Sequence, residues 1–139
     1  MNVSTADGTL VNWPAFSQAR AELGANFVRI LGYFREDGVK SVAQIEEAMR
    51  SLNATAMVIP AHTLKGESRQ FGADPLGELA ELIEVIARNC IESRDEPTQA
   101  LAHVVKLRPL FEATLNLLER EGNPLVERRP AAGFGRRAG

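Results

Sequence analysis

Apolar residues recur three and four positions apart along most of the chain, and the strict alternation of polar and apolar residues that marks strands is almost absent. This spacing predicts amphipathic helices over residues 14–23, 25–36, 42–52, 55–71, 75–90 and 97–121. The connections between the long helices are short, which favours antiparallel neighbours. We therefore expect an all-α fold, an antiparallel four-helix bundle with an accessory N-terminal helix.

Glycine and proline mark the expected helix ends. Gly38 stands between two apolar stripes and is predicted to separate the second helix from the third. Gly72 follows the last apolar residue of the fourth helix, where a left-handed residue commonly closes a helix. Asp74 followed by Pro75 is typical of an N-cap and the first helical residue. The chain is therefore expected to reverse direction over residues 72–75.

Length and composition fit one globular domain, since the chain has 139 residues, of which 45% are hydrophobic and 24% charged. We expect the bundle to occupy residues 1–122. Residues 123–139, which hold four arginines among Gly, Ala and Pro, are expected to form a flexible basic tail. A net charge of −2 gives no electrostatic footprint for nucleic acid.

Cysteine content and hydropathy restrict the remaining classes of protein. Cys90 is the only cysteine, so the chain cannot form an internal disulfide or a thiolate metal cluster. No apolar run reaches the roughly 18 residues of a membrane span, and the first residues lack the features of a signal peptide. We expect a cytoplasmic monomer that binds neither membranes nor nucleic acid, with no metal site of its own.

One helix face gathers residues that a core does not need. With about 100° per residue, His62 points away from the apolar stripe of its helix, and Lys65, Gly66 and Arg69 fall on the same side. A glycine in mid-helix costs about 1 kcal/mol relative to alanine, and Gly66 removes the side chain that would most obstruct the imidazole. An exposed histidine among ordinary surface charges is the simpler interpretation, but the combination favours an anion site at His62.

Two apolar residues accompany this face. Val58 and Ile59 lie in the turn before His62 and fall on its side of the helix rather than on the core side. Exposed apolar residues rimmed by charge are a usual sign of a protein interface, so a partner is expected to dock over Val58, Ile59, His62, Gly66 and Arg69. The alternative is that the apolar pair packs against an adjacent helix.

The same region resembles a known family. Residues 61–68 read A-H-T-L-K-G-E-S, residues 71–73 read F-G-A, and residues 76–84 read L-G-E-L-A-E-L-I-E. These segments resemble the histidine phosphotransfer (HPt) domains of bacterial multistep phosphorelays, and the likeness covers about residues 25–121. Glu67, where a small residue is common, and Gly77, where alanine is usual, depart from the family pattern. Because Glu67 lies about 140° round the helix from His62, little effect on the site is expected.

The resemblance implies a phosphocarrier. A ring nitrogen of His62, by family habit Nε2, would accept a phosphoryl group from a receiver-domain aspartate and pass it to another. Lys65 would bind phosphoryl oxygens, and Gly66 would give the partner access. The partners would be receiver domains of response regulators or hybrid histidine kinases. The sequence shows no nucleotide loop and no carboxylate cluster beside His62, so we expect no kinase activity and no bound cofactor, with Mg²⁺ supplied by the receiver.

Two other functions remain open. A helical adaptor that binds partner proteins without being phosphorylated would keep the bundle but would not need His62, Lys65 and Gly66 together. An enzyme with His62 as general base would need an orienting carboxylate, and the sequence reveals none. Glu84 is instead interpreted as part of a solvated face, pairing with Arg88 at i+4.

Overall fold

The computed structural model describes residues 10–122. Its α-helices are α2 (Trp13–Leu23), α3 (Phe27–Arg50), α4 (Ala54–Gln70), α5 (Asp74–Ser93) and α6 (Leu101–Gly122), and short 3-10 turns occupy Gly24–Asn26 and Thr98–Ala100. The described part of the chain contains no strand. The predicted basic tail, residues 123–139, lies outside the described residues.

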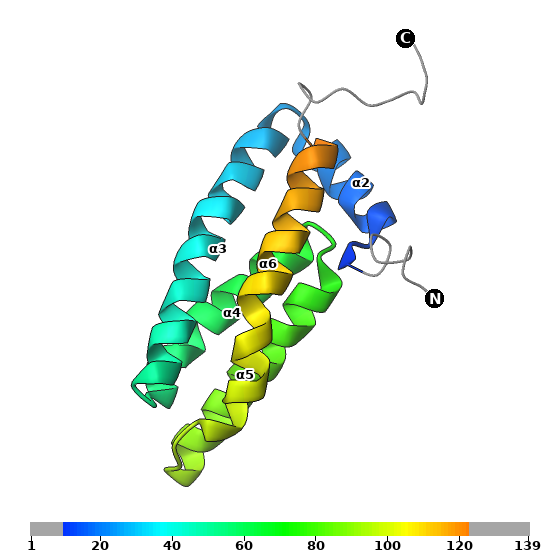
Figure 1. The fold of residues 1–139 in the computed structure, drawn as a ribbon. Coiled ribbons are helices and arrows are strands. Elements are labelled where there is room, and N and C mark those ends of the chain that lie inside the picture. The colour runs from blue at the N-terminus through cyan, green and yellow to red at the C-terminus, as the bar shows by residue number, and fades with distance from the viewer. Residues whose placement is uncertain (1–9, 123–139) are drawn as a thin grey trace, which may run out of the picture.

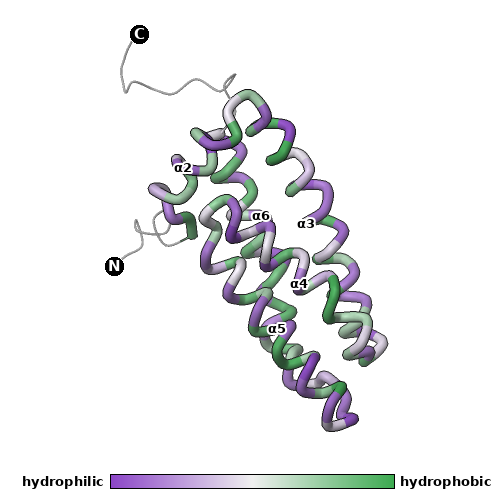
Figure 2. The backbone as a smooth tube through the Cα atoms, turned by 180° about the vertical axis from the view of Figure 1, so that it is seen from behind, coloured by the Kyte–Doolittle hydropathy of each residue, from purple (hydrophilic) through white to green (hydrophobic). Residues whose placement is uncertain are grey.

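Helices α3 to α6 form an antiparallel bundle in which each packs beside its neighbours in the chain and α6 closes the ring against α3 (Figure 1). Helix α2 lies across the end of the bundle where α3 begins and α6 ends (Figure 1). Apolar and polar residues alternate around each helix (Figure 2). The predicted four-helix bundle with an accessory N-terminal helix is confirmed. Within residues 10–122, no helix combines the length and apolar character needed to cross a bilayer.

A row of aromatic rings holds four of the helices together. Phe16 of α2 contacts Phe27 of α3 with ring centroids 5.4 Å apart, and Phe27 contacts Phe71 at 5.7 Å. Phe71 in turn contacts Phe34, which contacts Phe111 of α6 at 5.9 Å. Edge-to-face and tilted contacts at such distances are favourable beyond the area that they bury. The row fixes the C-terminal end of α4 relative to α2, α3 and α6.

Gly38 does not end a helix, and the two segments predicted on either side of it form the single helix α3. Gly38 is buried against α6, and a Cβ atom at this position would overlap the ring of Phe111. The glycine therefore allows close approach of α3 and α6. The stabilisation from this packing outweighs the helix propensity of about 1 kcal/mol that a mid-helix glycine loses.

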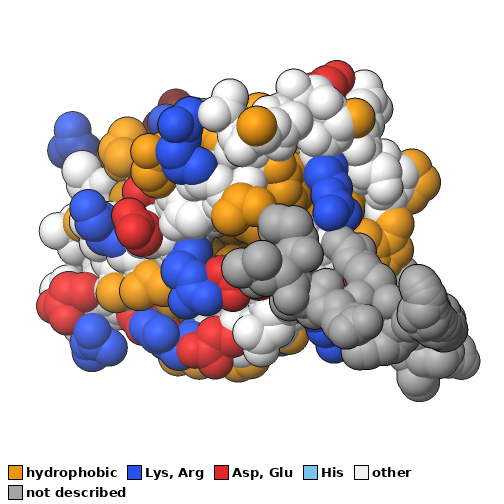
Figure 3. All heavy atoms as spheres, turned by 90° about the horizontal axis from the view of Figure 1, so that it is seen from above, with side chains coloured by type: hydrophobic (Ala, Val, Ile, Leu, Met, Phe, Trp, Pro, Cys, Tyr) orange, Lys and Arg blue, Asp and Glu red, His pale blue; other side chains and the backbone are white. Residues whose placement is uncertain are grey.

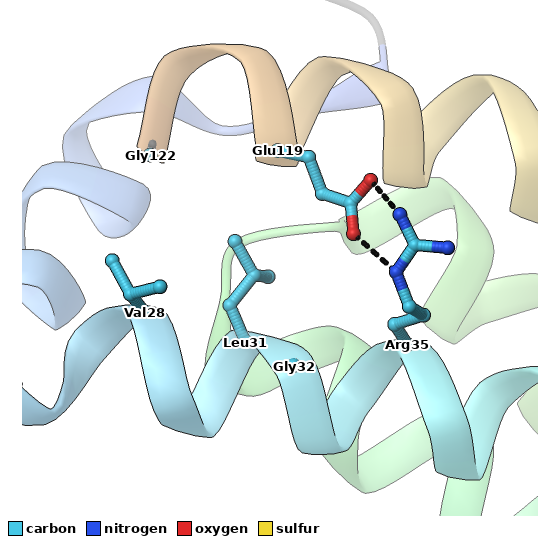
Figure 4. A pocket seen from close by; sticks show the side chains of 6 residues that line it. All are labelled: Val28, Leu31, Gly32, Arg35, Glu119 and Gly122. Carbon is cyan, nitrogen blue, oxygen red and sulfur yellow. Dashed lines mark hydrogen bonds and ion pairs between the residues drawn. The ribbon is translucent and has the colours of Figure 1, made fainter. Parts of the chain in front are cut away.

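Ion pairs span the same junction between α3 and α6. Arg35 pairs with Glu119 through two of its three nitrogens, Nε and Nη2, with 2.7 Å between Arg35 Nε and Glu119 Oε2 (Figure 4). Arg108 forms a bidentate ion pair with Glu46 in the same way, at 3.0 and 2.7 Å.

Beside the pair of Arg35 and Glu119 is a hollow in the surface, lined by Val28, Leu31, Gly32, Arg35, Glu119 and Gly122. Viewed from above, charged side chains of both signs and apolar groups are interspersed over the visible face (Figure 3).

The turn between α4 and α5 is fastened to the N-terminal helix. Gly72 closes α4 with φ +77°, as the sequence predicts, and its carbonyl accepts a hydrogen bond of 2.8 Å from the Asn12 backbone N–H. A Cβ atom at Gly72 would lie 2.7 Å from the Asn12 carbonyl oxygen, so only glycine fits. Asp74 is the first helical residue and Ala73 the N-cap, one residue earlier than predicted for the cap. The Asp74 carboxylate accepts a 3.4 Å hydrogen bond from Asn12 Nδ2.

Glu67, which was expected to have little effect on the His62 site, makes an unusual contact with α3. Its side chain is half-buried, its Oε1 atom has no hydrogen-bond partner, and it shares a hydrogen bond with Asp37. Three causes together raise the pKa of Glu67 to about 7. The largest is burial, followed by the hydrogen bond with Asp37 and then by the charge of Asp37. Near neutral pH the Glu67 carboxyl is therefore partly protonated and can donate to Asp37 across the contact between α3 and α4.

This pair should make the bundle less stable in base. Because the pKa of Glu67 rises on folding from 4.5 to about 7, the folded chain binds the proton more tightly. The free energy of unfolding is then unaffected by the ionisation of Glu67 below pH 4.5, and it falls as the pH rises through 7. Glu67→Gln removes the charge and keeps a donor for Asp37, so it should raise the free energy of unfolding at pH 8 by about 1–3 kcal/mol.

Urea unfolding at pH 5 and pH 8 measures this effect. The matched control is Glu78→Gln on the exposed side of α5, which should leave the difference between the two pH values unchanged. A Glu67→Gln protein that loses as much stability as the parent between pH 5 and pH 8 would contradict a raised pKa of Glu67 in the folded chain.

Candidate functional site

His62 lies in the middle of α4 with its imidazole directed outward. The side chain is 57% exposed, although Ala61 before it is fully buried, so the predicted orientation agrees with the structure. The ring is not free, because His62 Nδ1 lies 3.0 Å from the Oε2 atom of Glu84 on α5. Among the described residues, Nε2 has no hydrogen-bond partner. The two ring nitrogens therefore have different environments, one held by the protein and one facing solvent.

Glu84 is a buried carboxylate, with only 4% of its surface exposed. Its Oε1 atom pairs with Lys65 Nζ at 2.9 Å, and its Oε2 atom accepts from Arg88 Nε at 2.9 Å as well as facing His62. Burial acts to raise the pKa of Glu84, but hydrogen bonds from Lys65, Arg88 and His62 outweigh it and lower the pKa to about 2. The group is therefore ionised throughout the physiological range.

The sequence interpretation of Glu84 was wrong. It was assigned to a solvated face, and no carboxylate was expected beside His62, yet the two residues meet across the α4–α5 contact. The pairing of Glu84 with Arg88 at i+4 is confirmed. A signal was present in the sequence, because Glu84 lies next to Ala80 and Ala87 on the helix surface, and both are fully buried. Small residues on either side of a carboxylate indicate that another helix packs closely there.

The ionised carboxylate determines which nitrogen of His62 carries the proton. A neutral imidazole has one N–H donor and one acceptor nitrogen. Because Glu84 has no proton to donate, the contact of 3.0 Å is favourable only when His62 Nδ1 carries the hydrogen. The unprotonated nitrogen is then Nε2, whose lone pair points away from the protein. The site can therefore act as a nucleophile through Nε2 toward a group presented from outside.

Lys65 and Gly66 lie one turn beyond His62. Lys65 is 21% exposed and held by Glu84, so its ammonium is positioned rather than mobile, and it has three donors of which this ion pair occupies one. A Cβ atom at Gly66 would meet nothing within 4 Å. The packing of residues 10–122 therefore gives no reason for a glycine here, and the open space lies on the His62 face.

Arg69 is paired rather than free. Its guanidinium lies 2.6 Å from Glu81 Oε1, and the two side chains are 42% and 46% exposed. The stem of Arg69 covers Gly77, where a Cβ atom would come within 2.9 Å of Arg69 Cγ. The departure from the family pattern at Gly77 thus makes room for Arg69 over α5.

The apolar pair divides between core and surface. Ile59 is 68% exposed, as expected, but Val58 is 5% exposed and belongs to the core, so the prediction of an exposed Val58 was wrong. The reason is that α4 packs against both α3 and α5, which buries a wider arc than the single stripe assumed from the sequence. Within residues 10–122, no three His, Cys, Asp or Glu side chains are grouped to hold a metal ion.

Comparison with known proteins identifies one family. The family model described as "Hpt domain" matches residues 29–121, which is more than half of the chain and includes the whole His62 site. Neither the curated proteins nor the solved structures gave a match.

Proposed function

Because this chain belongs to the family of Hpt domains, which serve histidine phosphotransfer in two-component phosphorelays, we propose that His62 is its phosphoaccepting residue. The observation that supports this most is the orientation of the imidazole, with Nδ1 held by Glu84 and Nε2 facing solvent. The proposed function is a carrier that takes a phosphoryl group from one receiver-domain aspartate and delivers it to another.

In the proposed reaction, the Nε2 lone pair of His62 attacks the phosphorus of an aspartyl phosphate on the receiver. The bond from phosphorus to the aspartate oxygen breaks, and its electron pair stays on the carboxylate. Transfer to the next receiver reverses these steps. Enzymes accelerate phosphoryl transfer chiefly by positioning and by stabilising charge on the phosphoryl oxygens. Lys65 is proposed to donate to those oxygens from one turn away, and the receiver is proposed to bring Mg²⁺.

The exposure of the site favours a carrier over the two alternatives. An enzyme with His62 as general base now has the orienting carboxylate that the sequence did not reveal, but a ring that is 57% exposed does not exclude water from a small substrate. An adaptor has no need for a carboxylate that selects the tautomer of an exposed histidine. We assign no kinase activity to this chain and expect the phosphoryl group to come from a partner.

The docking surface is proposed to cover Ile59, His62 and Gly66, with Arg69 at its edge. Ile59 lies one turn before His62, and beside it a groove runs between α3 and α4, lined by Gln44, Glu47, Ala48, Ser51, Asn53, Ala56, Ile59 and Pro60. Burial of Ile59 would supply apolar area, while Arg69 would aid encounter with an acidic partner surface.

We also propose that the protein is a monomer and that it is located in the cytoplasm. In that compartment the buried thiol of Cys90 would stay reduced.

Labelling should be confined to His62. Purified receiver domains phosphorylated with acetyl phosphate should transfer an acid-labile, base-stable label to the parent protein, and His62→Gln should reduce it to background with unchanged helical content. The control is His103→Gln, the other histidine of the chain, which should label like the parent. Label that persists in the His62→Gln protein would refute the assignment.

Access over Gly66 can be tested with a pair of glycines. Gly66→Leu should raise helix propensity but place a side chain in the path of the partner, so transfer should fall at least about 100-fold with stability unchanged or increased. Gly32→Leu is the matched control, because Gly32 also lies within a helix and a Cβ atom there would meet nothing within 4 Å, but it lines the hollow between α3 and α6. Equal transfer rates for the two variants would show that the partner does not approach over Gly66.

The docking role of Ile59 has a control on the opposite side of the bundle. Ile59→Asp should weaken receiver binding about 10-fold or more, because it places a charge in a desolvated contact. The control is Val105→Asp on α6, because Val105 is 62% exposed and Ile59 is 68% exposed. The Val105→Asp protein should bind the receiver like the parent. Titration calorimetry with the receiver that labels His62 measures both, and equal affinities would place the interface elsewhere.

A further inference from the structure

Glu84 lies behind the reacting side of His62, in a position where it cannot easily be displaced. Its carboxylate is 4% exposed and is held from two helices, by Lys65 of α4 and Arg88 of α5. Its position and its charge are both fixed by these contacts. The charge therefore remains next to Nδ1 after Nε2 has received a phosphoryl group, when the ring reacts in the opposite direction.

The protonation of Nδ1 decides how readily a phosphorylated ring gives up its phosphoryl group. When the group leaves, the bond between phosphorus and Nε2 breaks and its electron pair returns to Nε2, while a new bond forms from phosphorus to the oxygen of an aspartate or of water. If Nδ1 keeps its proton, the departing ring is a neutral imidazole. If Nδ1 has lost it, the departing ring is an imidazolate anion, a far poorer leaving group.

We propose that Glu84 is a positioning residue that keeps the proton on Nδ1 of phosphorylated His62 and thereby sets the lifetime of the phosphohistidine, favouring rapid onward transfer at neutral and mildly alkaline pH. The inference rests on the proposed function of His62. An Nδ1 without a proton would place its lone pair 3.0 Å from a carboxylate oxygen that has no proton to give, and this arrangement is repulsive.

The other charged groups around the ring do not reverse this preference. On α4 and α5, Lys65 and Arg88 are both directed at Glu84, and Arg69 is paired with Glu81. On α3, Glu47 lines the groove beside Ile59 and is paired with Arg50. Lys65 and Arg88 would disfavour a cationic ring, but the phosphoryl group adds negative charge that compensates them. Glu84 remains the only one of these groups in hydrogen-bond contact with Nδ1.

The test measures the loss of phosphate from the protein after labelling with phosphoramidate, a small donor that needs no docking surface. In the parent, the rate of label loss should stay high up to a higher pH than in the Glu84→Gln protein. The pH at which this rate falls should differ between the two proteins by about one unit or more. At pH 8 the variant should hold its label at least several-fold longer and deliver it more slowly to an unphosphorylated receiver domain. Glu81→Gln, which changes a carboxylate that does not contact His62, should follow the parent.

A second measurement does not depend on the variant folding with two unpaired cations. In the phosphorylated parent, ¹⁵N-resolved NMR of the His62 ring should show Nδ1 still protonated at pH 8, and a phosphohistidine peptide should not. Loss of the Nδ1 proton at the same pH in protein and peptide, or identical rate profiles for the parent and a folded Glu84→Gln protein, would overturn the inference and leave the carrier function intact. A parent protein that accepts no label at His62 from phosphoramidate or from receivers would overturn both.

Discussion

The antiparallel contact between α4 and α5 is the constraint on which the site depends. His62 and Glu84 are separated by 22 residues, and they meet only because the chain reverses at Gly72 and the two helices then pack side by side in one register. The register is secured at the turn, where the Asn12 backbone binds Gly72 and the Asn12 side chain binds Asp74 at the start of α5, and by Phe71 in the aromatic row. A shift of one residue along α5 would turn Glu84 by about 100° and remove it from the imidazole.

The buried carboxylate also explains why the cations at this site act as a group. Removing a carboxylate from water costs several kcal/mol, and that cost is offset here by Lys65, Arg88 and the Nδ1–H of His62. In the proposed reaction Lys65 keeps its contact with Glu84 and donates to the phosphoryl oxygens through its other N–H groups. Glu84 then keeps Lys65 and Arg88 and gains a cationic ring as partner, so its charge stays compensated. The same carboxylate can thus serve both the free and the phosphorylated state without moving.

Sequence periodicity was sufficient for the fold and for the outward direction of His62, because both depend on which face of a helix is apolar. It failed where a position depends on a second helix. Gly38 is a close contact with Phe111 rather than a helix end, and Val58 is buried because α4 has two neighbours. Glu67 also faces α3, and its pKa is raised by burial there and by Asp37, which lies 30 positions earlier in the chain. Such pairings require the register between helices, which no single-helix pattern contains.

The two flanks of His62 differ in a way that bears on partner recognition. On the α5 flank, Lys65, Arg69 and Arg88 are all paired with carboxylates, so covering them would desolvate charges that already have partners. On the α3 flank, Ile59 stands exposed beside a groove whose one charged residue, Glu47, is paired with Arg50. Burial on this second flank gives apolar contact without separating ion pairs. Affinity is therefore expected to come mainly from the α3 flank, whereas the charges on the α5 flank act on encounter and on the phosphoryl group.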